Sequence, residues 1–311
     1  MHSSFYDELE NEFVERGLRI SHRFGAAEGL GRSGQIRADT DADVDPPQVV
    51  VAVDVEPVIN SALGAVSPMV GDMLLTLAPT GIVFEAAASL QRLGSESAKL
   101  VIHCRRGRGR DDPQGVGAAV EALHRHGVTG ATVLGRGEGT IAGRRYRPRL
   151  LSPSPAGPMM VVSIDSAEVF ARAVPSLSAM PQVEFMTAKP ISVCKWRGRR
   201  EPPPTPGAGR PAWSQITLYV AGDTLLTWRP AHLDLVQRLR KLGAPGVTVL
   251  RGAGGYALRP ERGRFERRVA PTVTTIVDTP DHVAQWLEAI DDITGDAGLV
   301  THEFVSAHRL M

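Results

Sequence analysis

The sequence predicts an α+β protein built from three tandem units with the element order βαββαβ, the first of which lacks its first strand. Two observations indicate this fold class. A segment with helical apolar spacing ends on glycine three times along the chain. After each glycine, at nearly the same interval, a β-branched run ends on aspartate. Self-similarity at a fixed spacing is typical of a repeated structural unit.

The helix-ending glycines set the length of the unit. Gly17, Gly127 and Gly243 are separated by 110 and 116 residues, and a second glycine follows each of them by twelve. The β-branched runs close 37, 38 and 35 residues after these glycines, on Asp54, Asp165 and Asp278. The unit is therefore about 112 residues long, which is the size of one small domain.

The middle unit predicts the element order. Its helices are indicated by apolar spacing and by the glycine that stops the first one, and its strands by β-branched runs of four to six residues. We expect strand 100–104, helix 116–126, strand 131–134, strand 159–164, helix 167–177 and strand 183–188. This order forms a four-stranded antiparallel sheet with two helices on one face.

The predicted boundaries are residues 1–96 for the first unit, 97–198 for the second, 199–211 for a linker and 212–311 for the third. The linker is predicted from its five prolines and its lack of apolar periodicity, which favour an extended, exposed chain. In the first unit, counting back 25 residues from Gly17 passes residue 1. The middle of its sheet is therefore expected to contain unpaired backbone, and either the chain start is cut short or another segment takes that place.

Composition excludes several classes of protein. The 35 basic and 34 acidic residues nearly cancel, but residues 1–98 have a net charge of −9 and residues 99–200 of +10. No apolar stretch reaches the ~20 residues of a membrane helix, and the start lacks the features of a secretory signal. Cys104 and Cys194 lie in no metal-binding pattern. We expect a cytoplasmic protein with no metal site.

Three short motifs lack the context that their chemistry needs. Gly29–Gly34 fits a dinucleotide fingerprint, but no helix pattern follows it. The acidic run Asp39–Asp45 lacks the glycine and the glutamate of a calcium loop. Ser192–Lys195 fits Ser-X-X-Lys without its companion motifs. We predict no catalytic residue, and the protein is not expected to be an enzyme.

Several segments of the second and third units resemble one family. They combine a helix that ends in glycine, a Thr-Val-Leu strand and a glycine-rich exit, and they are Gly130–Gly139, Ile216–Val220, Leu239–Tyr256 and Gly298–Val305. This combination resembles the PII-like signalling superfamily, in particular its branch known as domain of unknown function 190. The resemblance covers nearly all of the third unit, most of the second and, more weakly, the first.

The resemblance implies a non-enzymatic sensor with no resident cofactor. Members of the superfamily form compact trimers of ferredoxin-like subunits and bind small effectors, often adenine nucleotides, between subunits and beneath a mobile loop that joins strands two and three. Three units in one chain then imply a single-chain pseudo-trimer that needs no second copy. The expected partners are an anionic effector and a transporter, channel or enzyme that receives the signal. The acidic loop of the first unit, and Thr140-Ile141 where the third unit has Gly-Tyr, depart from a uniform trimer.

Arginines and glycines in the loops after the second strands are the candidate effector ligands. Arginine forks match phosphate oxygens, and glycines let backbone N–H groups approach an anion. The candidates are Arg136, Gly137, Glu138, Gly139, Arg144 and Arg145 in the second unit, and Arg251, Gly252, Gly254, Gly255, Tyr256 and Arg259 in the third. The alternative is a solvated loop in a chain that has 31 arginines against 4 lysines.

A nucleic-acid binding module is the second hypothesis. The basic runs at 105–110, 144–149 and 197–200 favour it. Only Tyr146 and Trp196 interleave these runs, whereas proteins that bind single strands use several stacking rings. Binding to nucleic acid is therefore the less favoured expectation.

Overall fold

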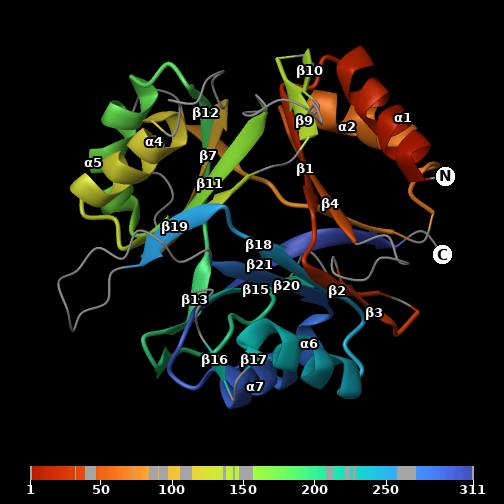
Figure 1. The fold of residues 1–311 in the computed structure, drawn as a ribbon, viewed down its shortest axis with the longest axis vertical. Coiled ribbons are helices and arrows are strands. Elements are labelled where there is room, and N and C mark those ends of the chain that lie inside the picture. Colours follow the sequence, from red (N-terminus) through yellow and green to blue (C-terminus); the bar gives the residue numbers. More distant parts are fainter. Residues whose placement is uncertain are drawn as a thin grey trace.

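The computed structural model describes residues 2–31, 33–38, 47–71, 73–83, 90, 97–105, 114–135, 138–142, 144–146, 157–207, 213–220, 225–226, 229–257 and 271–309. The fold is mixed α+β with antiparallel sheets. The helices lie on the outside of the molecule, and the strands converge between them (Figure 1). In the described part of the chain, no helix is long and apolar enough to cross a membrane.

Each unit supplies one pair of helices among the elements with described bounds. Residues 1–96 form α1 (His2–Glu15), β1 (Ile20–Gly25), β2 (Glu28–Leu30), β3 (Ile36–Ala38), β4 (Gln48–Val53), α2 (Glu56–Val66), β5 (Leu74–Leu77) and β6 (Gly81–Val83). Residues 97–200 form β7 (Ala98–Arg105), α4 (Gln114–Arg125), β8 (Gly130–Leu134), β9 (Glu138–Ile141), β10 (Arg144–Tyr146), β11 (Pro158–Asp165), α5 (Ala167–Ser178), β12 (Val183–Pro190), β13 (Ser192–Trp196) and β14 (Arg199–Arg200). The rest form β15 (Trp213–Val220), β16 (Leu225–Leu226), β17 (Arg229–Pro230), α6 (Ala231–Lys241), β18 (Val247–Arg251), β19 (Gly254–Ala257), β20 (Thr272–Asp278), the 3-10 turn η1 (Pro280–His282), α7 (Val283–Thr294) and β21 (Leu299–Arg309).

The second and third units have the same strand order. The six elements predicted for residues 100–188 are all present, and their strands lie in the order β8-β11-β7-β12. The third unit has β18-β20-β15-β21 in the same arrangement. The first strand of each unit therefore lies between its third and fourth strands. The first unit contains β1 and β4 as a pair, and no described strand pairs with the other edge of β4.

The helix-ending glycines have the predicted role. Gly17, Gly127 and Gly243 have φ angles of 66°, 83° and 82°, a region that favours glycine. In each case the glycine N–H donates to the carbonyl three residues back, and the next N–H donates to the carbonyl five residues back. These bonds satisfy the last carbonyls of α1, α4 and α6 and turn the chain into the second strand.

The repeated aspartates fix the turn between that helix and the second strand. Asp54 accepts the Arg19 N–H at 2.6 Å, and Asp165 accepts the Thr129 N–H at 2.8 Å. The equivalent residue in the third unit is Pro245, which has no N–H to donate. Asp278 there accepts a hydrogen bond from Trp286 Nε1 at 3.0 Å instead. The aspartate pattern in the sequence is thus a structural feature of each unit.

Short strands from the loops join each unit to its neighbour. β9 pairs with β1, β19 with β8, and β2 with β18. The three pairings have the same register. In each, the glycine twelve residues after one unit's helix-ending glycine faces the residue five positions after the helix-ending glycine of the neighbouring unit. The facing residues are Gly139 and His22, Gly255 and Thr132, and Gly29 and Thr248. The second unit joins the first, the third joins the second and the first joins the third, so the ring is closed. We call these pairings the β9–β1, β19–β8 and β2–β18 joints.

A second ring of pairings runs through the ends of the units. β6 pairs with β12, β13 pairs with the first part of β21, and the last part of β21 pairs with β5. Each unit again adds a strand to the next one. By this equivalence β5 is the fourth strand of the first unit.

The inner faces of the sheets share one core. Seven buried residues from all three units form this central cluster, namely Phe24, Leu134, Met160, Val162, Ile164, Ile191 and Val273. The outer faces pack beneath the helix pairs in separate clusters. The units are therefore parts of one body, because each buries its inner face against the other two.

The start of the predicted linker differs from expectation. Arg199 and Arg200 form β14, which pairs with β13 across a turn at Arg197 and Gly198. Both turn residues have positive φ, 53° and 76°, as a two-residue hairpin turn requires. The hairpin extends the sheet of the third unit through β13, so the chain is not yet a free linker at residue 199.

The joints predict a strong cost for adding a methyl group at Gly255. This residue has φ 149°, and a Cβ there would overlap the Ala131 carbonyl of the neighbouring unit. Gly255→Ala should lower the free energy of unfolding by roughly 1–3 kcal/mol from backbone strain alone. Gly64→Ala, in α2 with nothing within 4 Å, should instead raise it by about 0.5–1 kcal/mol. Urea unfolding of the two variants checks this, and equal stabilities would contradict the close approach at the joint.

Candidate functional site

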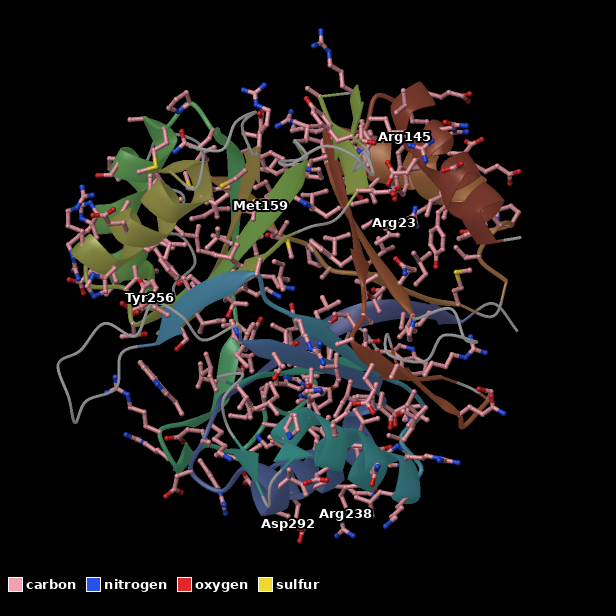
Figure 2. All side chains as sticks on the ribbon, viewed as in Figure 1. Arg23, Arg145, Met159, Arg238, Tyr256 and Asp292 are labelled. Carbon is pink, nitrogen blue, oxygen red and sulfur yellow. The ribbon has the colours of Figure 1, made fainter. Side chains whose placement is uncertain are left out.

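Ion pairs hold the β9–β1 joint. Arg23 Nη1 lies 3.0 Å from Glu138 Oε2, and the Arg23 guanidinium lies 4.5 Å from the ring centre of Tyr6. Arg145 Nη2 lies 2.5 Å from Asp7 Oδ1. Figure 2 shows Arg23 and Arg145 beside α1. Two predicted effector ligands, Glu138 and Arg145, therefore contact the first unit directly.

A carboxylate is buried beside these pairs. Glu10 accepts hydrogen bonds from the Ser21 hydroxyl at 3.1 Å and from the Thr140 hydroxyl at 2.7 Å. The Thr140 N–H donates to Ser21 Oγ at 2.9 Å. These three side chains come from α1, β1 and β9, so the network requires both units. Its hydrogen bonds compensate for the burial of a charged group.

Two buried histidines connect the same two units. His22 Nε2 lies 2.9 Å from His103 Nδ1, and the rings continue as a stack, with Phe24 next to His22 and Phe185 next to His103. Either tautomer leaves one ring N–H of the pair without an acceptor among the described residues. Burial lowers the pKa of His22 to about 3. Burial, followed by the His22 charge, lowers the pKa of His103 well below its ordinary value.

The β19–β8 joint is apolar by comparison. Tyr256 is buried in the core of the second unit, where its hydroxyl donates to the Val128 carbonyl at 2.9 Å. Burial, with the neighbouring Asp165, raises its pKa. The Ala253 N–H donates to the Val133 carbonyl, and the Gly252 N–H donates to the Pro271 carbonyl. Arg251 lies exposed at the end of β18, where the loop of the third unit begins.

A lysine pair lies deeper between the second and third units. Lys99 of β7 and Lys189 of β12 both form ion pairs with Glu303 of β21, the former at 2.5 Å. Gln215 Nε2 donates to the same carboxylate at 3.2 Å. One carboxylate thus faces two lysine side chains. Burial, followed by the charge of Lys99, lowers the pKa of Lys189 to about 6.

The structure separates the predicted effector ligands into two groups. Glu138, Gly139, Arg144 and Arg145 belong to the β9–β10 hairpin against the first unit. Arg251, Gly252, Gly254, Gly255 and Tyr256 lie at the β19–β8 joint, away from Arg145 (Figure 2). Gly139 has a structural role at the β9–β1 joint, and Gly255 and Tyr256 have structural roles at the β19–β8 joint. Arg136, Gly137 and Arg259 lie outside the described residues, as do the acidic residues 39–46. Anion binding by these loops stays a prediction.

Sequence reasoning missed the polar groups between the units. The histidine pair joins residues 81 apart, and Lys99 and Glu303 are 204 apart. A signal was present in β7, where Lys99 and His103 alternate with the buried Leu100, Ile102 and Cys104. Polar residues on the second face of a buried strand indicate that this face meets something other than solvent.

The family comparison matches the second and third units. The profile of DUF190, described as Uncharacterized ACR, matches residues 98–193 and 213–307, which is more than half of the chain. Two copies are matched, and the third copy that we expected at residues 1–96 is not. No curated protein matches the chain.

A solved structure also gives a match. It is a crystal structure of an anthrone oxidase-like protein, with 10% sequence identity over 73% of this chain and 95% of that chain. The TM-score is 0.19, so this match carries no argument about fold or function.

The histidine pair predicts an acid-sensitive contact between the first and second units. Histidines of the unfolded chain gain a proton near pH 6.5, whereas His22 in the fold does so only near pH 3. The stability that depends on the neutral pair is therefore complete above pH 6.5 and is lost as pH falls toward 3. We expect the free energy of unfolding to fall less steeply between pH 6.5 and 5 in the double variant His22→Gln, His103→Gln than in the natural chain. The difference in slope should reach about 1.4 kcal/mol per pH unit for each histidine removed.

Urea unfolding at several pH values measures this slope. The double variant is first compared with the natural chain at pH 7.5, where a cooperative transition establishes that it folds. Parallel stability curves for the two proteins below pH 6.5 would contradict the prediction.

Proposed function

The chain belongs to the DUF190 family, which is PII-like, and from that premise we propose that it is a non-enzymatic sensor of a small anionic effector. Its fold in this proposal is a single-chain pseudo-trimer of three ferredoxin-like units. The observation that supports it best is the closed ring of joints. Each loop after a second strand begins with a strand that pairs with the neighbouring unit. An effector that orders such a loop would act on the contact between two units.

The shared central cluster and the second ring of pairings also support the pseudo-trimer. Both relate the first unit to the other two, although fewer of its strands are described. Closed rings of this kind form when a head-to-tail contact repeats three times. In this chain the three contacts are not identical, so three different sites are expected.

We assign the effector to the β19–β8 joint. At the β9–β1 joint, Arg23 and Arg145 already form ion pairs with Glu138 and Asp7, and an anion there would have to displace a carboxylate. The loop of the third unit has a sequence that contains Arg259, Arg262 and Arg264, and Arg251 lies at its start. Arginine forks bind phosphate oxygens in pairs, so an adenine nucleotide fits this site.

Nucleic acid fits the described arginines less well. Arg105, Arg145 and Arg200 come from three different basic runs, and they pair with Glu184, Asp7 and Asp291. Acidic neighbours reduce the positive potential that a phosphate backbone requires. Nucleotide binding that persists at 200 mM salt, where non-specific binding to nucleic acid weakens steeply, would separate the two functions.

Calorimetry tests the assignment. ATP, ADP and AMP are titrated into the protein, with inorganic pyrophosphate as a probe for the phosphate contribution alone. The double variant Arg251→Ala, Arg259→Ala should weaken nucleotide binding at least about tenfold, since each charge-assisted hydrogen bond contributes roughly 1.5–3 kcal/mol.

Arg238→Ala is the matched control. This arginine lies on α6, 3.7 Å from Asp292, at the outer surface of the third unit and away from the joint (Figure 2). Its removal should leave binding unchanged. Equal losses in both variants, or no binding of any nucleotide or of pyrophosphate, would count against the proposal.

A further inference from the structure

The first unit has an open position in its sheet. In the second unit β7 lies between β11 and β12, and in the third β15 lies between β20 and β21. The equivalent neighbours in the first unit are β4 and β5. Among the described strands, β4 pairs with β1 alone and β5 with β21 alone. By this equivalence the position of a first strand lies between β4 and β5, and we call this position the strand slot.

Burial is incomplete on both sides of the strand slot. Every residue of β4 is half-buried, whereas its equivalents β11 and β20 are mostly buried. β5 is exposed at its first residue and half-buried in the rest, although β12 has four consecutive buried residues. The first unit therefore lacks burial in β4 and β5, the strands whose equivalents in the other two sheets pair with β7 and β15.

The helix above the strand slot shows the same deficit. Ile59 and Leu63 of α2 are half-buried, but the equivalent Phe170 and Val174 of α5 are fully buried. Four large apolar residues in the described part of the chain are exposed. Three of them, Val55 at 43%, Met73 at 41% and Leu74 at 44%, lie at the ends of α2, β4 and β5. Val55 follows the end of β4 and Leu74 begins β5, so exposed apolar residues border both of these strands.

We propose that the strand slot binds an extended segment of a partner polypeptide, which completes the first sheet. Among the described strands, one backbone edge of β4 and one of β5 have no partner strand, and a guest strand between them would pair with both edges, as in other cases of β-strand addition. The guest runs antiparallel to β4 and to β5, because β7 and β15 are antiparallel to both of their neighbours.

The native first strands define the chemistry of the guest. They place small or branched apolar side chains at every second position beneath the helices, namely Leu100, Ile102 and Cys104 in β7, and Ile216, Leu218 and Val220 in β15. The positions between them face the central cluster, where Val101 and Tyr219 contact it. The guest is therefore a segment of eight residues, the length of β7 and of β15, in which aliphatic side chains alternate with residues of mixed polarity.

The test uses a peptide copied from the chain itself. The probe has the sequence of β15, Trp213–Val220, with two lysines added at each end for solubility. The control peptide has the same composition, but its apolar residues are consecutive rather than alternating. We expect the β15 peptide to bind with 1:1 stoichiometry in calorimetry and to slow hydrogen exchange at the amides of β4, and we expect the control peptide to do neither.

Variants at the ends of the strand slot locate the binding. Val55→Asp and Leu74→Asp change exposed residues, so the fold should tolerate them, and each should weaken peptide binding at least tenfold. Trp196→Asp changes the remaining exposed apolar residue, on β13, and should leave binding unchanged. A peptide that does not bind, binds no better than its control, or is insensitive to Val55→Asp and Leu74→Asp would overturn the proposal. A dimer in light scattering that Val55→Asp dissociates would also overturn it, because a second copy would then cover the strand slot.

Discussion

The fold depends on the close approach of one backbone to another at the joints between units. Gly139 lies against the Ser21 carbonyl and Gly255 against the Ala131 carbonyl, at distances that leave no room for a side chain. This contact lets the start of each loop pair with the neighbour's second strand, and three such pairings close into a ring. The inner faces of the sheets then meet in the central cluster, and the helices remain on the outside. Because each unit relies on its neighbour for a strand, the units are not expected to fold independently.

The same arrangement buries polar groups at the contacts between units. The histidine pair, the Glu10 network and the two lysines that share Glu303 all join residues of different units. A group of this kind is costly to bury unless its partner is in place, so the groups favour one relative arrangement of the units over others. The first unit keeps this arrangement with a narrower sheet. Its incomplete burial lies in β4, β5 and α2, the elements that border the strand slot.

Local patterns in the sequence predicted the element order, because helix-ending glycines and β-branched runs act through their own neighbours in the chain. The structural role of the second glycine was not predicted from the sequence. Its position after a strand suggested a phosphate-binding loop, whereas Gly255 provides the approach of β19 to β8. The hairpin at Arg199 was also missed, since it depends on two consecutive left-handed residues, one of them Arg197. The histidine and lysine groups could not be paired from the sequence, because each partner lies in a different unit.

Hydrogen exchange at the joint amides tests the closed ring most directly. The Ala27 N–H donates to the Val249 carbonyl, the Ala253 N–H to the Val133 carbonyl and the Ala142 N–H to the Arg19 carbonyl, and each bond crosses between units. If the three units form one cooperative body, these amides exchange only on global unfolding, with the same free energy as the amides of β7 and β11. Fast exchange at Ala27, Ala142 and Ala253 while β7 and β11 stay protected would show that the units open independently, which would contradict the closed ring.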